Sequence, residues 1–278
     1  MSIAGRSKRV CVCADDFGLS EAGSCAIVHL ASMGAISATS CIVDGAFAGR
    51  YAGALRGSGA GMSLGLHFNL TIANGPTLRH DLLTWLGLSF VLRSVNRAAL
   101  VPELHRQLDA FVALFGQAPH FVDGHEHVHQ FPIVRDALLE VLRSRFNAQA
   151  AVRSTMPRVW RGVKAQVIAE LGGRAMRRSL RKHGLPANSD FAGVYDFGTR
   201  IGYAQRMQSW LRSFAHDGLI MCHPELPAAD RGGSGGSGAR ASEYQFLASA
   251  DWPRLLAAEG IELAPFSGAL ARSGLLPT

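Results

Sequence analysis

The chain has few charged residues and no long apolar run. Only 18% of its 278 residues are Asp, Glu, Lys or Arg, whereas 48% are hydrophobic. This balance excludes a disordered chain and indicates a well-packed globule. No apolar run approaches the roughly 18 residues of a membrane-spanning helix, so we expect no span. The first stretch, MSIAGRSKRVCVCADD, reaches acidic residues before the apolar part of a signal peptide could form, and we expect a cytoplasmic protein.

Cysteine is scarce and does not occur in paired spacings. The five cysteines include no CxxC motif, and their number is odd. This pattern excludes a disulfide scaffold and a zinc site of the paired-cysteine type. We expect small buried thiols in a reducing compartment.

The net charge of +7 is compatible with a polyanionic partner. Much of the excess lies in the basic segment 153–182, where a solvated helix face is the simpler interpretation. No RNA- or DNA-binding motif accompanies it, so we expect no nucleic-acid partner.

Short β-like runs alternate with helical runs along the whole chain, which predicts an α/β fold. About seven strands favour a single-domain, distorted (β/α) TIM-like barrel with parallel strands, formed by residues 1–278. The Gly/Ser-rich stretch 230–242 is expected to be a flexible loop. The strands are expected at residues 9–14, 35–43, 62–70, 120–124, 148–154, 218–223 and 261–266.

Several helix boundaries have sequence signals. Ser20 is placed to cap a helix that ends near Gly34, and Pro102 is expected in the first turn of a helix that Gly116 terminates. Further helices are expected at residues 47–55, after 132, at 203–214 and at 243–259.

Polar side chains follow the expected strands at their carboxyl ends. In a (β/α) barrel these ends converge on one rim, where such folds place their active sites. Residues more than two hundred positions apart would then share one pocket. The residues concerned are Asp15, Asp16, His67, Asp123, His125, Arg153 and His223.

Two imidazoles and one carboxylate form a typical catalytic site for a divalent metal ion. Asp16, His67 and one histidine of HEHVH would supply this set, and Asp15 would remain free to act as a general base. A strand would place His125, His127 and His129 on one face, whereas a helix would pair the first with the third. Periodicity therefore leaves the third ligand open.

The motifs resemble those of the YdjC-like carbohydrate deacetylase family. The resemblance implies a distorted (β/α) barrel, one divalent metal ion (Zn²⁺ or Mg²⁺) and hydrolysis of the acetamido group of an amino sugar or oligosaccharide. It also implies that Asp16, His67 and His125 are the metal ligands. The matching stretches are ADDFGLS (14–20), GLHFNLT (65–71), LFGQAPHFVDGHEHVHQFP (114–132), MCHPEL (221–226), SEYQFL (242–247) and GIELAPF (260–266).

The resemblance also implies the catalytic residues. Asp15 would be the general base, His223 the general acid, and Arg153 would orient Asp15. The chain has Gly124 and Glu126 where other members often have Ser and an additional His, and neither position is an implied ligand.

Other functions stay open at this point. The same barrel could support a metal-dependent phosphoesterase or the hydrolysis of a different amide, and a non-catalytic polyanion-binding protein is a third hypothesis. A homodimer is one option by analogy with the family. Four aromatic residues are candidates for stacking on sugar rings: Phe17, Phe68, Trp85 and Phe131.

Overall fold

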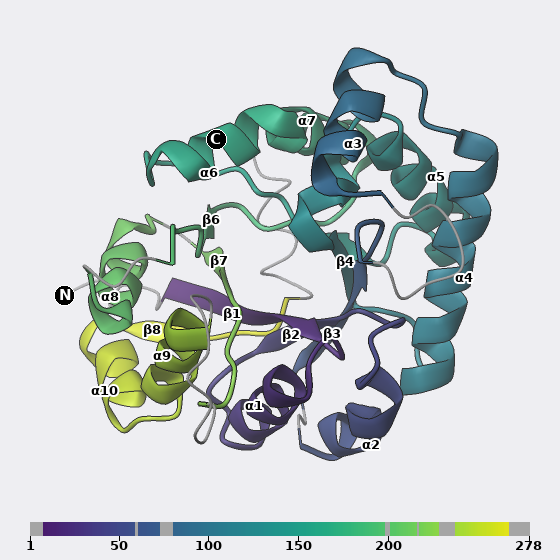
Figure 1. Ribbon diagram of the computed structural model, residues 1–278. Coiled ribbons are helices and arrows are strands. Elements are labelled where there is room, and N and C mark those ends of the chain that lie inside the picture. Colours follow the sequence, from purple (N-terminus) through teal and green to yellow (C-terminus); the bar gives the residue numbers. More distant parts are fainter. Residues whose placement is uncertain are drawn as a thin grey trace.

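The computed structural model describes residues 8–58, 61–72, 80–197, 201–215, 217–227 and 237–266. Its centre is one curled sheet of eight parallel strands (Figure 1). The expected distorted (β/α) barrel is therefore confirmed. The strands are β1 (Lys8–Phe17), β2 (Ala38–Cys41), β3 (Ser63–Phe68), β4 (Phe121–Gly124), β5 (Ala151–Val152), β6 (Phe191–Ala192), β7 (Gly218–Cys222) and β8 (Ile261–Leu263).

Helices surround the sheet in chain order, with α1 and α2 on one side, then α4 and α5, then α6 and α7, then α8 to α10 (Figure 1). No helix in the described part of the chain is long and apolar enough to span a bilayer. The α-helices are α1 (Glu21–Ser32), α2 (Ala48–Ser58), α3 (Leu82–Leu86), α4 (Arg97–Phe115), α5 (Val134–Phe146), α6 (Val163–Ile168), α7 (Arg174–His183), α8 (Tyr203–Ser213), α9 (Ser237–Leu247) and α10 (Asp251–Ala258). Short π- and 3₁₀-helical segments are η1 (Gly87–Val91), η2 (His125–Gln130) and η3 (Ala169–Gly173).

The strand order is β5-β4-β3-β2-β1-β7-β6, and β8 pairs with the start of β1 on the edge that faces β2. Within the described ranges no strand ladder joins β5 to β6, so the barrel is not closed by strand pairing. Asn188 bridges part of this gap, because its side-chain amide accepts from Ser154 N–H and donates to the Ser154 carbonyl, both at 2.8 Å. The sheet therefore curls far enough to bring the strand ends of both halves together.

Several expected boundaries are confirmed. The Ser20 side chain accepts a hydrogen bond from Gly23 N–H at the start of α1, and Gly34 follows this helix in the left-handed conformation. Gly116 ends α4 in the same conformation.

Other expected boundaries are wrong. The fourth helix begins at Arg97, because Asn96 caps it by accepting from Ala99 N–H, and Pro102 lies inside it. Strand β6 was not expected, since its two residues carry too little pattern. Residues 230–236 of the expected loop lie outside the described ranges, whereas residues 237–242 belong to α9.

Alternation along β1 separates the two sides of the sheet. Val10, Val12 and Ala14 pack against the outer helices, whereas Cys11 and Cys13 belong to a second buried cluster inside the barrel. All five cysteines are free and four are buried, which agrees with the expected small hydrophobic role.

A β-bulge interrupts this alternation at the end of β1. The register with β2 shifts between Ala14 and Phe17, and Asp16 has a left-handed φ of 66°. Phe17 returns to the outer core. The bulge therefore lets two successive carboxylates, Asp15 and Asp16, face the barrel interior, which a regular strand would not allow.

We expect Gly65→Ala to destabilise the protein. A methyl group there would lie 2.4 Å from ring atoms of Phe121, which is fully buried in the adjacent strand. Overpacking of this kind costs about 1–3 kcal/mol, so the midpoint of urea unfolding should fall. The matched control is Gly53→Ala on α2, where an added Cβ meets nothing within 4 Å and alanine favours the helix. Equal midpoints for the two variants would contradict this packing.

Candidate active site

Six strands contribute one polar residue each to a layer at the carboxyl end of the barrel. Five of them stand two positions after a residue of the second buried cluster inside the barrel, which we call the inner cluster. In β3, His67 stands two positions after Gly65, which touches Phe121 of this cluster. Strand alternation therefore points all six inward. The layer comprises Asp15, Ser40, His67, Asp123, Arg153 and His223. Five of these six residues were singled out from the sequence, and the structure brings them all to one end of the sheet.

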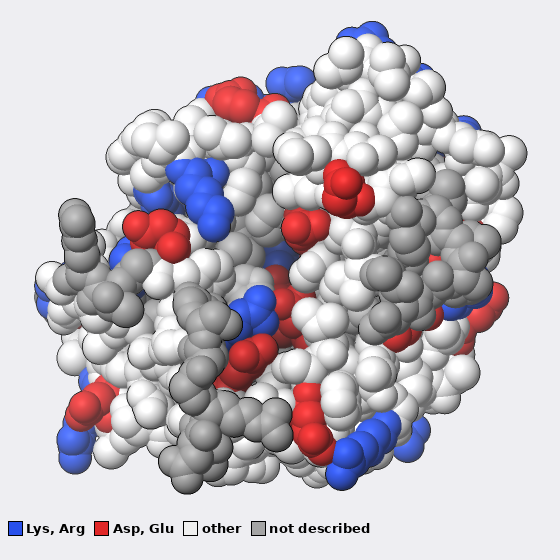
Figure 2. Space-filling view, in the orientation of Figure 1, with Lys and Arg blue, Asp and Glu red and all other residues white. Residues whose placement is uncertain are grey.

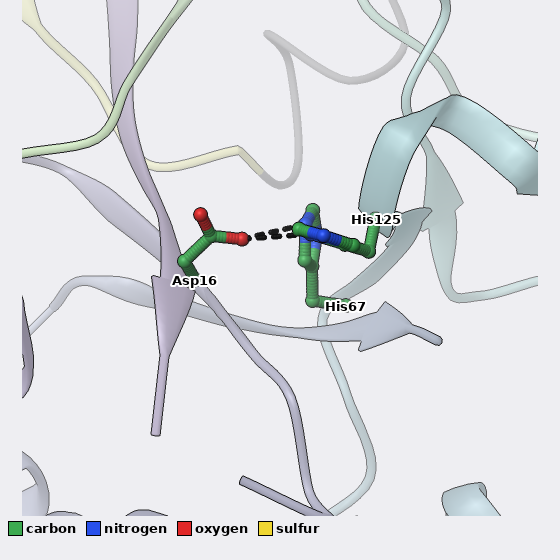
Figure 3. A group of neighbouring side chains, drawn as sticks. All are labelled: Asp16, His67 and His125. Atoms are coloured by element: carbon green, nitrogen blue, oxygen red, sulfur yellow. Dashed lines mark hydrogen bonds and ion pairs between the residues drawn. The ribbon is translucent and has the colours of Figure 1, made fainter. Parts of the chain in front are cut away.

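Asp16, His67 and His125 point toward one another from β1, β3 and the start of η2 (Figure 3). Asp16 Oδ1 lies 2.9 Å from His125 Nδ1 and 3.4 Å from His67 Nε2. One donor atom from each residue lies within 4.8 Å of the others, so the three could hold a metal ion. Burial raises the pKa of Asp16, but hydrogen bonds from His125 and His67 outweigh it, and the pKa lies well below its ordinary value.

The far side of the His67 ring is fixed by a carboxylate. His67 Nδ1 lies 2.7 Å from Asp123 Oδ1 and 3.0 Å from Ser40 Oγ. Burial lowers the pKa of His67, yet the charge and hydrogen bond of Asp123 outweigh burial and raise the pKa to about 10. Because an ionised carboxylate can only accept, Nδ1 donates to Asp123 and Nε2 faces Asp16. Such a carboxylate–histidine pair orients metal-binding histidines in many proteins.

Arg153 lies fully buried beneath this group and forms two ion pairs. Its guanidinium donates to both oxygens of Asp15, at 2.5 and 2.6 Å, and lies 2.6 Å from Asp123 Oδ2. Burial raises the pKa of Asp15, but Arg153 lowers it by more, so the carboxyl stays ionised at neutral pH. The guanidinium of Arg153 thus holds both oxygens of Asp15.

Cys13, Asp15 and Asp123 also come close enough to hold a metal ion. Their centre is already occupied by Arg153, whose Nη2 lies 3.1 Å from Cys13 Sγ. Burial also raises the pKa of the Cys13 thiol well above its ordinary value, so the sulfur keeps its proton. This second cluster is therefore an arginine site.

HEHVH forms neither a regular strand nor a regular helix. Strand β4 ends at Gly124, and Glu126 and His127 within η2 have left-handed φ angles of 51° and 61°. His125, just before these two residues, contacts Asp16, whereas His129 Nε2, beyond them, lies 3.1 Å from the Arg153 carbonyl oxygen. Both periodicities considered for this stretch were wrong, and the strained turn decides which histidine reaches the cluster.

His223 lies at the end of β7, across the site. Burial lowers the pKa of its ring below the ordinary value, while the carboxylates of Asp16 and Asp15 act in the opposite direction. Its backbone N–H donates to Oε2 of Glu243, which α9 supplies. Arg240, also on α9, lies 3.4 Å from Asp16 Oδ2.

Sequence reasoning missed Ser40, Arg240 and Glu243, and it left Asp123 without a role. Asp123 had a signal, since it ends an apolar strand two positions before His125. Ser40 stands in a small-residue strand, and Arg240 belongs to the stretch interpreted as a loop. Glu243 was expected on a helix, but nothing in the sequence connects it with His223.

The four aromatic candidates for sugar stacking are core residues. Each is at most 2% exposed, and the Trp85 indole N–H donates to the Leu70 carbonyl oxygen at 2.9 Å. These four candidates are therefore packing residues and not sugar-stacking residues. Figure 2 shows a hollow near the centre of this face, with acidic and basic side chains at its floor and edge.

Comparisons with known proteins agree with this arrangement. The model of the YdjC-like protein family matches residues 9–258. The chain belongs to the YdjC-like protein family. The expected resemblance is therefore confirmed across most of the chain.

Relatives in the YdjC-like family are named as deacetylases. A chitooligosaccharide deacetylase of Serratia marcescens is 30% identical over 78% of this chain and 81% of its own length. A carbohydrate deacetylase of Mus musculus is 29% identical, over 89% of this chain and 86% of the relative. The expectation of an enzyme is thus confirmed at the level of the family.

A solved structure shares the fold. A protein of Enterococcus faecalis named for cellobiose-phosphate cleavage superposes with a TM-score of 0.68 over 94% of this chain and 98% of the other, at 19% identity. This similarity supports the curled barrel and carries no information on substrate.

We expect Arg153→Met to destabilise this YdjC-like protein strongly at neutral pH. The variant leaves Asp15 and Asp123 buried without their cation, a loss of about 3–5 kcal/mol. Because the folded pKa of Asp15 is lowered, its stabilising effect is present above its unfolded pKa of about 3.9 and is lost as the pH falls through the folded value. The deficit should therefore shrink below about pH 4.

Urea unfolding between pH 3 and pH 7 measures this deficit. Arg254→Met is the control, because Arg254 forms an exposed pair with Asp251, and this substitution should change stability by less than about 1 kcal/mol. A deficit for Arg153→Met that stays constant with pH would contradict the assignment.

Proposed function

We propose that this protein hydrolyses the N-acetyl group of an acetylated amino sugar or oligosaccharide, giving acetate and a free amine, with one divalent metal ion held by Asp16, His67 and His125. The observation that carries the proposal is the convergence of these three side chains beside an ionised carboxylate, Asp15. The names of the relatives, chitooligosaccharide deacetylase and carbohydrate deacetylase, support the substrate class.

The donor set fits a metal ion. Two imidazole nitrogens and one carboxylate oxygen leave positions for water and substrate, as in catalytic zinc sites. Magnesium prefers oxygen ligands, so this set favours Zn²⁺ over Mg²⁺. Asp123 also supports a metal ion at this site, since its contact with His67 Nδ1 keeps Nε2 of the same ring facing Asp16.

A bound divalent ion would polarise the acetyl carbonyl group and acidify a water molecule. Asp15 would accept the proton of the attacking water as general base. Its pairing with Arg153 keeps the carboxylate ionised and fixes its orientation, because both oxygens are held by the guanidinium. Ser40 Oγ, 3.3 Å from Asp15 Oδ1, adds a third donor.

His223 would protonate the departing nitrogen. An amine leaves as a neutral molecule only when it gains a proton, so amide cleavage needs an acid on the leaving-group side. The lowered pKa of His223 makes its protonated ring a stronger acid, at the expense of the fraction protonated at rest.

A two-metal phosphoesterase receives less support. It would need further free ligands beside Asp16, but Asp123 is paired with His67 and Arg153, and His129 contacts the Arg153 carbonyl oxygen. In the described ranges, only the two groups discussed above bring three candidate ligands together. We therefore propose a single ion and a deacetylation.

We expect metal-dependent acetate release from short N-acetylglucosamine oligomers. Protein stripped of metal and reloaded with Zn²⁺, Mg²⁺, Mn²⁺ or Co²⁺ should release acetate, and Asp16→Ala should lose at least about 10³-fold in kcat, because the carboxylate ligand is gone. Glu140→Ala, an exposed residue of α5, is the control. Metal-independent release, or full activity of Asp16→Ala, would contradict the proposal.

We also expect Asp123→Asn to weaken zinc binding about 10- to 100-fold, because the partner of His67 Nδ1 loses its charge. Ser40→Ala removes the other, neutral partner of this nitrogen and should cost no more than about fivefold. Competition with a chromogenic chelator measures both affinities. Equal losses for the two variants would show that the Asp123 charge is not what matters.

A further inference from the structure

We infer that Glu243 is a positioning residue for this reaction: its carboxylate holds the backbone of His223 and so places the imidazole at the departing nitrogen. The inference rests on the proposed function, in which His223 is the acid. It concerns a different part of the chain, because α9 follows the site's other elements in sequence and contacts the residue after β7 through Glu243.

Within the described ranges, the strand ladders supply no acceptor for the His223 N–H. Leu219 N–H donates to the Asp190 carbonyl oxygen, so by alternation the His223 N–H also faces the β6 side, where pairing stops at Ala192 and Ile220. The His223 N–H, first beyond the ladder, donates instead to Glu243 Oε2. The early end of β6 thus creates the need for an acceptor at His223, and Glu243 meets it.

Glu243 is itself fixed on both oxygens. Its side chain is fully buried, and the Tyr195 hydroxyl donates to Oε1 at 2.5 Å. The nearby Arg240 pairs with Asp16 and Glu225 instead. Burying a carboxylate with two neutral donors is unfavourable, so a purely structural role would be served better by an apolar or amide side chain.

One turn of α9 holds residues 223–225, which follow β7 directly. Glu225 N–H donates to the Arg240 carbonyl oxygen at 3.2 Å, and Arg240 Nη1 donates to Glu225 Oε1 at 3.2 Å. Ser20 Oγ also donates to Glu225 Oε1. His223 and Glu225 are therefore tied to residues 243 and 240 respectively, on either side of Pro224.

Tyr195 joins this support to the ring of His223. The rings of Tyr195 and Phe197 have centroids 4.7 Å apart, and Phe197 lies edge-on to His223 at 6.0 Å. Backbone and ring of His223 are thus held by two neighbouring groups, Glu243 and Phe197. Loss of the carboxylate would let the imidazole move relative to Asp15 and Asp16.

The test compares Glu243→Leu with Glu243→Gln in the full-length, zinc-loaded protein. Leucine removes the acceptor, and we expect kcat on an N-acetylglucosamine oligomer to fall about 10- to 100-fold with KM and zinc affinity within about twofold. Glutamine keeps one oxygen that can accept from His223 N–H, so it should restore kcat to within about fivefold of wild type. Gln245→Ala, an exposed residue of the same helix, is the control and should match wild type.

Two further readouts separate positioning from a general effect on folding. In a His223→Ala background, Glu243→Leu should lower kcat by less than about twofold, because the residue through which it acts is gone. In protein labelled with ¹⁵N-histidine, the His223 amide signal should move upfield and exchange faster in Glu243→Leu, and stay near its wild-type position in Glu243→Gln. The His223→Ala spectrum assigns the signal.

Wild-type kcat for Glu243→Leu, or losses that multiply in the His223→Ala background, would overturn the inference. If Glu243→Leu does not fold, Glu243→Gln and Tyr195→Phe carry the test through the His223 amide signal. An unshifted signal in Tyr195→Phe, together with wild-type kcat in both of these variants, would then overturn the inference. If wild-type protein releases no acetate, the proposed function fails, while the amide signal still decides whether Glu243 holds His223.

Discussion

The site depends on one buried arginine. Arg153 places a single positive charge between Asp15 and Asp123. Asp15 then faces the barrel interior as an ionised acceptor, and Asp123 fixes the orientation of the His67 ring. Without the guanidinium, two carboxylates in a dry barrel would repel one another and take up protons. The cation therefore balances the charge of both groups and fixes where each of them lies.

Strand alternation and one bulge decide which side chains reach this arginine. The inner cluster of small and apolar residues ends one layer below the site, and the next inward residue along six of the eight strands is polar. At β1 the bulge adds a second carboxylate to the same side, at the cost of a left-handed Asp16. On the other side of β7, the early end of β6 leaves the backbone N–H of His223 to Glu243 on α9.

The sequence was sufficient for the barrel and for most of the polar layer, because strand-end polar residues are local features that need no knowledge of packing. It could not choose among the histidines of HEHVH, since two left-handed residues, Glu126 and His127, set the direction of the turn. It also misjudged the start of α9, where a Gly/Ser-rich composition hides a helix. The partnership of Glu243 with His223 depends on contacts between distant segments, which no local pattern records.

The most direct test of this account is anomalous diffraction at the zinc edge from crystals of the zinc-loaded protein. We predict one strong peak within coordination distance of Asp16, His67 and His125, with Arg153 still paired to Asp15. A peak among Cys13, Asp15 and Asp123, with the guanidinium displaced, would contradict the central claim. So would the absence of any peak in protein that releases acetate.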